Sequence, residues 1–89
     1  MTETTVCTFH TNNLFNEWVN KFDFDEAPAR KAKNIKVLFK RVNKDKPHKA
    51  IVVVQTEEGF IGRHIQENFD NLKKNGADMS TAVPSTWFQ

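Results

Sequence analysis

Five consecutive apolar residues, AIVVV at positions 50–54, constrain the fold of this chain more than any other feature of its sequence. A strand with one face in water alternates apolar and polar residues, whereas an uninterrupted apolar run is typical of a strand covered on both faces. With 89 residues, the chain is expected to form one domain over residues 1–89. The run therefore predicts a central strand over residues 49–56, and both of its faces need cover.

Three other segments have the composition of strands. TTVCTFHT at 4–11 alternates, IKVLFKRV at 35–42 is rich in β-branched and aromatic residues, and STAVPSTWF at 80–88 resembles an edge strand because it contains a proline. The polar loop NKDKPH at 43–48 joins the second of these segments to the apolar run as a hairpin.

Helical spacing of apolar residues appears in two places. LFNEWVNKF at 14–22 predicts one helix, followed by a short helical piece after Asp25, and a second helix begins at Phe60 and ends before Gly76. The second helix is expected to bury Ile61, Ile65, Phe69 and Leu72. The order of elements is then β-α-β-β-α-β, which predicts an α+β, ferredoxin-like fold: a four-stranded antiparallel sheet with two helices on one face.

Two helices cover only one face of such a sheet, and the residues of the other face are apolar as well. On the central strand, Ile51 and Val53 point to one side, while Ala50, Val52 and Val54 point to the other. On the 35–42 strand, simple alternation places the residues on two faces: Ile35, Val37 and Phe39 on one, Leu38 and Val42 on the other.

An exposed apolar sheet face of this size is unusual in a soluble monomer. Two sheets packed face to face would cover both surfaces, and a twofold homodimer is the most common way to achieve this. We therefore expect a homodimer through the sheet face. The alternative is a monomer whose sheet is covered in patches by residues 24–34 and the C-terminal tail.

The order of elements, together with a sheet that is apolar on both sides, resembles the dimeric α/β barrel proteins, which include small antibiotic-biosynthesis and haem-degrading monooxygenases. Nearly the whole chain resembles a family of short, uncharacterised proteins from marine cyanobacteria. The resemblance implies the dimeric α/β barrel fold and no particular activity. It is carried by four phrases: TTVCTF, NEWVNKFDFDEA, RVNKDKPHKAIVVVQTEEGF and FDNLKKNGADMSTAVPSTW.

The likeness to dimeric-barrel oxygenases implies one enzymatic alternative, since some of them work without a metal and use Asn, Trp and His or Arg around a pocket between helices and sheet. His64 flanks the predicted buried stripe of the second helix, where an imidazole could transfer a proton. The structural alternative is that the Trp residues are core and His64 is merely hydrogen-bonded. The residues of suitable type are His64, Asn68, Trp18, His10 and Trp87.

Metal and cofactor sites are not expected. The three histidines are far apart in the sequence, and the single cysteine, Cys7, is expected to be a buried apolar thiol.

A second alternative comes from the basic segment at residues 30–49, which holds nine Lys or Arg residues and one acid, Asp45. Such asymmetry can mark a surface that binds nucleic acid or an acidic protein, although it is more typical of a solvated hairpin that avoids edge-to-edge pairing. The candidate anion-binding residues are Lys33, Lys36, Lys40, Arg41, Lys44, Lys46 and Lys49.

The chain shows no apolar run of membrane-spanning length and no signal-peptide pattern, so we expect a cytoplasmic protein. No strong catalytic motif is present. The sequence favours a small non-catalytic or accessory binding protein that acts as a homodimer on a small-molecule or protein ligand. The alternatives are a cofactor-independent monooxygenase-like enzyme and a binder of an anionic partner through residues 30–49.

Overall fold

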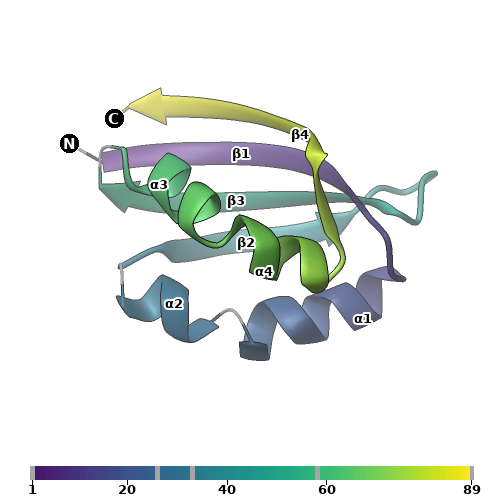
Figure 1. Cartoon of the computed structure of the whole chain (residues 1–89). Coiled ribbons are helices and arrows are strands. Elements are labelled where there is room, and N and C mark those ends of the chain that lie inside the picture. Colours follow the sequence, from purple (N-terminus) through teal and green to yellow (C-terminus); the bar gives the residue numbers. More distant parts are fainter. Residues whose placement is uncertain (1, 26, 33, 58, 89) are drawn as a thin grey trace.

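The computed structural model describes residues 2–25, 27–32, 34–57 and 59–88. It contains a four-stranded antiparallel sheet in the order β2-β3-β1-β4, with the helices on one side of it (Figure 1). This confirms the predicted α+β class and is compatible with a ferredoxin-like fold. The strands are β1 (Thr2–Thr11), β2 (Lys36–Val42), β3 (Lys49–Glu57) and β4 (Ala77–Phe88).

The short helical piece predicted after Asp25 is present, but the segment before it is π-helical and the second predicted helix is divided at Asn68. Pro28 lies in the first turn of α2, where the missing backbone N–H is tolerated, and the helical layer changes pitch before it. At Asn68 the backbone leaves the helical region, while the Asn68 side chain donates to the His64 carbonyl oxygen at 2.9 Å. The helical elements are α1 (Phe15–Asn20), the π-helical turn η1 (Lys21–Asp25), α2 (Ala27–Ala32), α3 (Phe60–Glu67) and α4 (Phe69–Lys74).

The apolar run forms most of β3, which lies between β1 and β2. Ala50, Val52 and Val54 are buried beneath the helices as members of the core cluster. Val53 points to the opposite side, where it pairs with Val6 of β1, and it is only 6% exposed in the single chain. The predicted division of the run between two faces is therefore confirmed.

We call the side of the sheet away from the helices the outer face. Directly paired residues of an antiparallel sheet lie on the same side. Because Val53 and Val6 lie on the outer face, the pairing of the strands identifies the other residues of this face. Its apolar residues are Val6, Phe39, Ile51, Val53, Val83 and Trp87.

The predicted alternation along β2 is wrong beyond Val37. Val37 pairs with Val54 on the helix side, but the register then shifts, and Phe39 pairs with Val53 on the outer face. Leu38 is the additional residue of a β-bulge, which changes the side to which every following residue points. Phe39 therefore does not share a face with Val37 as expected.

The core lies between the sheet and the helices and is centred on aromatic rings. Trp18 is 1% exposed, and its ring centroid lies 5.3 Å from that of Phe9 and 4.9 Å from that of Phe22. Leu72 is buried as predicted, but Phe69 is 45% exposed because the break at Asn68 turns the start of α4 away from the sheet. Phe69 is therefore not part of the buried stripe that the sequence predicted.

Gly76 ends α4 with a left-handed backbone, as the sequence predicted, at a φ of 100°. An added Cβ would lie 2.6 Å from Nδ2 of Asn13, and the Gly76 carbonyl accepts the Asn12 backbone N–H at 2.7 Å. We expect Gly76→Ala to lower the free energy of unfolding by about 1–3 kcal/mol, because alanine disfavours this conformation.

Urea denaturation followed by circular dichroism measures this effect. Gly62→Ala is the matched control, since Gly62 lies within α3 with no atom within 4 Å of an added Cβ. A helix interior favours alanine, so this variant should be no less stable than the wild type. Equal stability of Gly76→Ala and the wild type would contradict the requirement for glycine at the end of α4.

Candidate functional site

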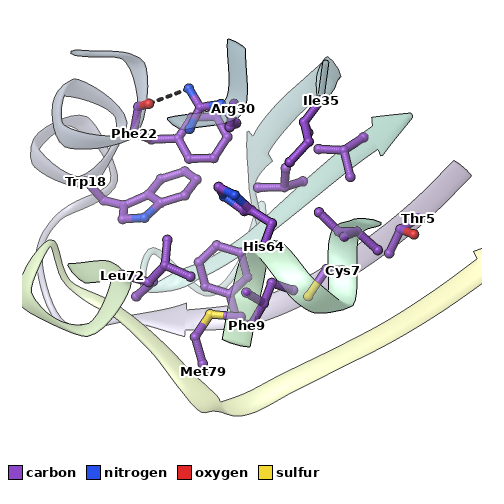
Figure 2. A pocket seen from close by; sticks show the side chains of 15 residues that line it. Thr5, Cys7, Phe9, Trp18, Phe22, Arg30, Ile35, His64, Leu72 and Met79 are labelled. Carbon is purple, nitrogen blue, oxygen red and sulfur yellow. Dashed lines mark hydrogen bonds between the residues drawn. The ribbon is translucent and has the colours of Figure 1, made fainter. Parts of the chain in front are cut away.

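A partly open cavity of about 70 Å³ lies between the helical layer and the sheet (Figure 2). An engineered apolar cavity of about 150 Å³ holds a benzene molecule, so this cavity has room for a ligand of only a few heavy atoms. Most of its wall is apolar, from strands and helices alike, including Cys7, Phe9, Val52, Val54, Ile61 and Leu72.

Trp18 lines this cavity and carries a buried hydrogen-bond donor. Its position on α1 follows from the helical spacing with Phe15 and Phe22, and all three rings pack together. Among the described residues, the indole Nε1–H has no hydrogen-bond partner. Buried tryptophan N–H groups usually find an acceptor, and a buried donor without one costs about 1–3 kcal/mol. A ligand atom that accepts this hydrogen bond would recover that cost.

Arg30 brings a permanent positive charge to the cavity wall. It lies on α2, is 8% exposed, and its guanidinium carbon sits 3.8 Å above the centre of the Phe22 ring. One guanidinium nitrogen, Nη2, donates to the Phe22 carbonyl oxygen at 2.5 Å, as the dashed line in Figure 2 shows. A cation on an aromatic face is stabilised by the ring quadrupole, so Phe22 fixes the place of this charge.

His64 is the third nitrogen-bearing side chain of the cavity wall. It lies on α3, is 5% exposed, and its imidazole points toward Trp18 and Phe22 in Figure 2. The Asn68 side-chain nitrogen lies 3.3 Å from His64 Nδ1, so Asn68 donates to this nitrogen. In a neutral ring the proton then resides on Nε2. His64 is thus held in one tautomer and one orientation.

The five residues considered for an oxygenase site do not gather in one place. Trp18 and His64 line the cavity, and Asn68 contacts His64 without lining the cavity itself. His10 is exposed at the end of β1, and Trp87, which is 64% exposed, pairs with Thr4 on the outer face. The sheet therefore separates His10 and Trp87 from the other three.

The basic segment likewise spreads over several surfaces. Lys40 faces the helices, where its Nζ lies 3.0 Å from Asp23 Oδ1. Lys36 and Arg41 pair with Gln55 and Ile51, and so belong to the outer face. The remaining candidates are Lys44 and Lys46, which are exposed in the β2–β3 loop, Lys49, which is half-buried at the start of β3, and Lys33, which lies outside the described residues.

Arg30 is the cavity residue that sequence reasoning missed. It was considered only as one of the nine basic residues of the 30–49 segment. The surrounding sequence, APARKA, does not distinguish Arg30 from its exposed neighbour Lys31, because both stand in the same short helix. The difference arises from packing, because Arg30 is buried against Phe22 while Lys31 is exposed.

The remaining sequence candidates for chemistry have structural roles or no partners of the right kind. Burial raises the pKa of the Cys7 thiol, so it stays neutral at pH 7 and packs as an apolar group. No group of three or more His, Cys, Asp or Glu that could hold a metal ion occurs in the described ranges. Within those ranges, too, no helix is both long enough and apolar enough to cross a membrane.

A protein-family model described as a domain of unknown function (DUF3764) matches residues 2–89 of the chain. No curated protein matches the sequence. The match covers almost every residue, and its description carries no activity.

Proposed function

Since the chain belongs to the DUF3764 family of domains of unknown function, membership supplies no activity, and we propose that this protein is a small, non-catalytic binding protein that acts as a homodimer. Its ligand is a small molecule held in the cavity between helices and sheet, and a second copy covers the outer face. The observation that carries the binding role is the buried Trp18 Nε1–H, a donor without a partner in the described structure, at an apolar cavity.

Binding is favoured over oxygenase-like catalysis by the content and size of the cavity. Of the five residues considered for catalysis, only Trp18 and His64 line it. A space of about 70 Å³ has room for a few heavy atoms, which is less than an aromatic oxygenase substrate needs.

The homodimer is supported by the apolar residues of the outer face. Phe39, Val83 and Trp87 are 41%, 66% and 64% exposed in the single chain. They flank Val53 and Val6 on the central strands, so the apolar residues extend across all four strands. Exposed apolar groups in such an arrangement are typical of interaction surfaces, and twofold face-to-face packing would give the dimeric α/β barrel that the sequence suggests.

The anion-binding alternative has weaker support. Arg30 and Lys40 of the basic segment are engaged with the helical layer through Phe22 and Asp23. Among the described anion-binding candidates, the exposed lysines that remain are divided between the outer face, with Lys36, and the β2–β3 loop, with Lys44 and Lys46. A phosphate backbone would therefore meet a dispersed set of charges in a single chain.

The two tryptophans provide an internal test of the binding site. In a ¹H–¹⁵N spectrum, each indole Nε1–H gives a separate signal, one from the cavity and one from the outer face. We expect titration with ethanol, acetamide or acetate to shift the Trp18 signal in a saturable way and to leave the Trp87 signal in place. Affinities in the millimolar range are expected for ligands with so few heavy atoms.

Assignment of the two signals comes from the Trp87→Phe variant, which removes the outer-face indole and keeps the cavity intact. If no compound of this panel shifts the Trp18 signal up to tens of millimolar, the cavity is packing space and the proposed binding role is wrong.

A further inference from the structure

We propose that Pro84 prevents the free edge of β4 from pairing with a strand of a second copy of the chain. β4 is bordered by β1 on one side only, and it forms the upper border of the sheet in Figure 1. The backbone groups on the other side of an edge strand can form hydrogen bonds with another chain. This edge is a surface distinct from both the ligand cavity and the outer face.

The C-terminal half of β4 has the composition of an edge strand that pairs readily. Residues 79–88, MSTAVPSTWF, include no charged side chain, and every residue from 83 to 88 is exposed. The valine, threonine, tryptophan and phenylalanine of this segment all favour strands. Exposed, uncharged segments with high β propensity associate with other chains unless a charge or a proline interrupts them. In residues 83–88 the only interruption of this kind is Pro84.

The opposite edge of the sheet is protected by other means. β2 carries Lys36, Lys40 and Arg41, and the bulge at Leu38 interrupts its regular pairing. Charged side chains and bulges both discourage an edge strand from pairing with another chain. In β4 the register shifts only before Val83, so the stretch that follows has neither a bulge nor a charge.

The pairing of β1 with β4 indicates that the backbone of Pro84 faces the free edge. Pro84 is paired with Cys7, and a hydrogen-bonded pair would need the N–H group that proline lacks. Two positions along, the Oγ1 atoms of the paired Thr5 and Thr86 lie 3.0 Å apart, as expected where side chains approach closely in a non-hydrogen-bonded pair. Alternate pairs are of the same type, so Pro84, Thr86 and Phe88 present their backbone groups to the free edge.

An incoming strand would therefore find no donor at the centre of this edge. It could accept hydrogen bonds from the N–H groups of Thr86 and Phe88, but at Pro84 it would meet the pyrrolidine ring. Two donors near the end of a strand give too short a pairing to be stable. Pro84→Val would supply the missing N–H group and leave residues 83–88 as a continuous edge.

Light scattering at equal protein concentrations tests this role of Pro84. We expect Pro84→Val to form species of at least about twice the wild-type mass, which grow with concentration and bind thioflavin T. Pro47→Val is the matched control, since Pro47 is an exposed proline of the β2–β3 loop, and it should keep the wild-type mass. Pro84→Lys should keep it as well, because a charge protects the edge although the N–H group is restored.

Hydrogen exchange of the wild-type amides provides a second test, which does not depend on the folding of a variant. The N–H groups of Thr86 and Phe88 should exchange at least about tenfold faster than those of Ser85 and Trp87, which face β1. Slow exchange at Thr86 and Phe88 would show that the edge is already paired and would overturn the proposal. Equal masses of folded Pro84→Val and the wild type would also overturn it, whereas the wild-type mass alone tests the homodimer.

Discussion

Replacing Trp18 with alanine is expected to lower the free energy of unfolding by about 3–5 kcal/mol. The side chain is 1% exposed and contacts Phe9, Phe15 and Phe22, so its removal would open a large void next to a cavity of about 70 Å³ that already exists. Domains have a total stability of about 5–15 kcal/mol, and so small a chain stands at the lower end. Urea denaturation followed by far-UV circular dichroism measures the loss.

Phe24→Ala is the matched control for this substitution. Phe24 is also an aromatic residue of the helical layer, but it is 75% exposed. Its removal should change the free energy of unfolding by less than about 1 kcal/mol. Similar unfolding midpoints for Trp18→Ala and Phe24→Ala would show that Trp18 does not hold the helices on the sheet.

Replacing Val53 with aspartate is expected to cost about 3 kcal/mol or more. Val53 is 6% exposed at the centre of the outer face, between Val6 of β1 and Phe39 of β2. A carboxylate at this position would be surrounded by apolar side chains with no opposite charge directly across either neighbouring strand. Urea denaturation at several protein concentrations measures the loss, since unfolding of a dimer depends on concentration.

Val83→Asp separates folding from assembly on the same face. Val83 is 66% exposed in the single chain, so an aspartate there should be hydrated and compatible with the folded monomer. In a homodimer through the outer face the same carboxylate would lie at the interface and oppose association. Val53→Asp with wild-type stability would contradict the burial of the central strand on this side.

Local sequence patterns were sufficient to predict most of the sheet. The uninterrupted apolar run identified β3 and the sides to which Val52 and Val53 point, because alternation in a strand depends only on the backbone. Gly76 marked the end of the second predicted helix, and its backbone is left-handed in the structure. These features follow from backbone geometry and do not depend on distant contacts.

The errors occurred where packing overrides a regular pattern. Leu38 is apolar like Val37 and Phe39, and nothing in IKVLFKRV shows that the strand contains an additional residue at this position. The exposure of Phe69 follows from the break at Asn68, where a side-chain hydrogen bond competes with the helix. In both cases a single local departure altered the orientation of the residues that follow.

The candidate site was predictable only in part. Trp18 was expected to be core by its helical spacing, and His64 was expected beside the buried stripe; both line the cavity. The contribution of Arg30 to the cavity wall depends on the ring of Phe22, eight positions earlier in the sequence, and on the turn between the two residues. His10 and Trp87 were considered with this site by residue type alone, and the sheet places them on its far side.

The mass of the protein in solution is the most direct test of the homodimer that covers the outer face. Light scattering at micromolar concentration should give twice the 10.3-kDa mass of one chain for the wild type. Val83→Asp should give the mass of one chain with the circular dichroism of a folded protein. A monodisperse wild-type species of 10.3 kDa would contradict the homodimer.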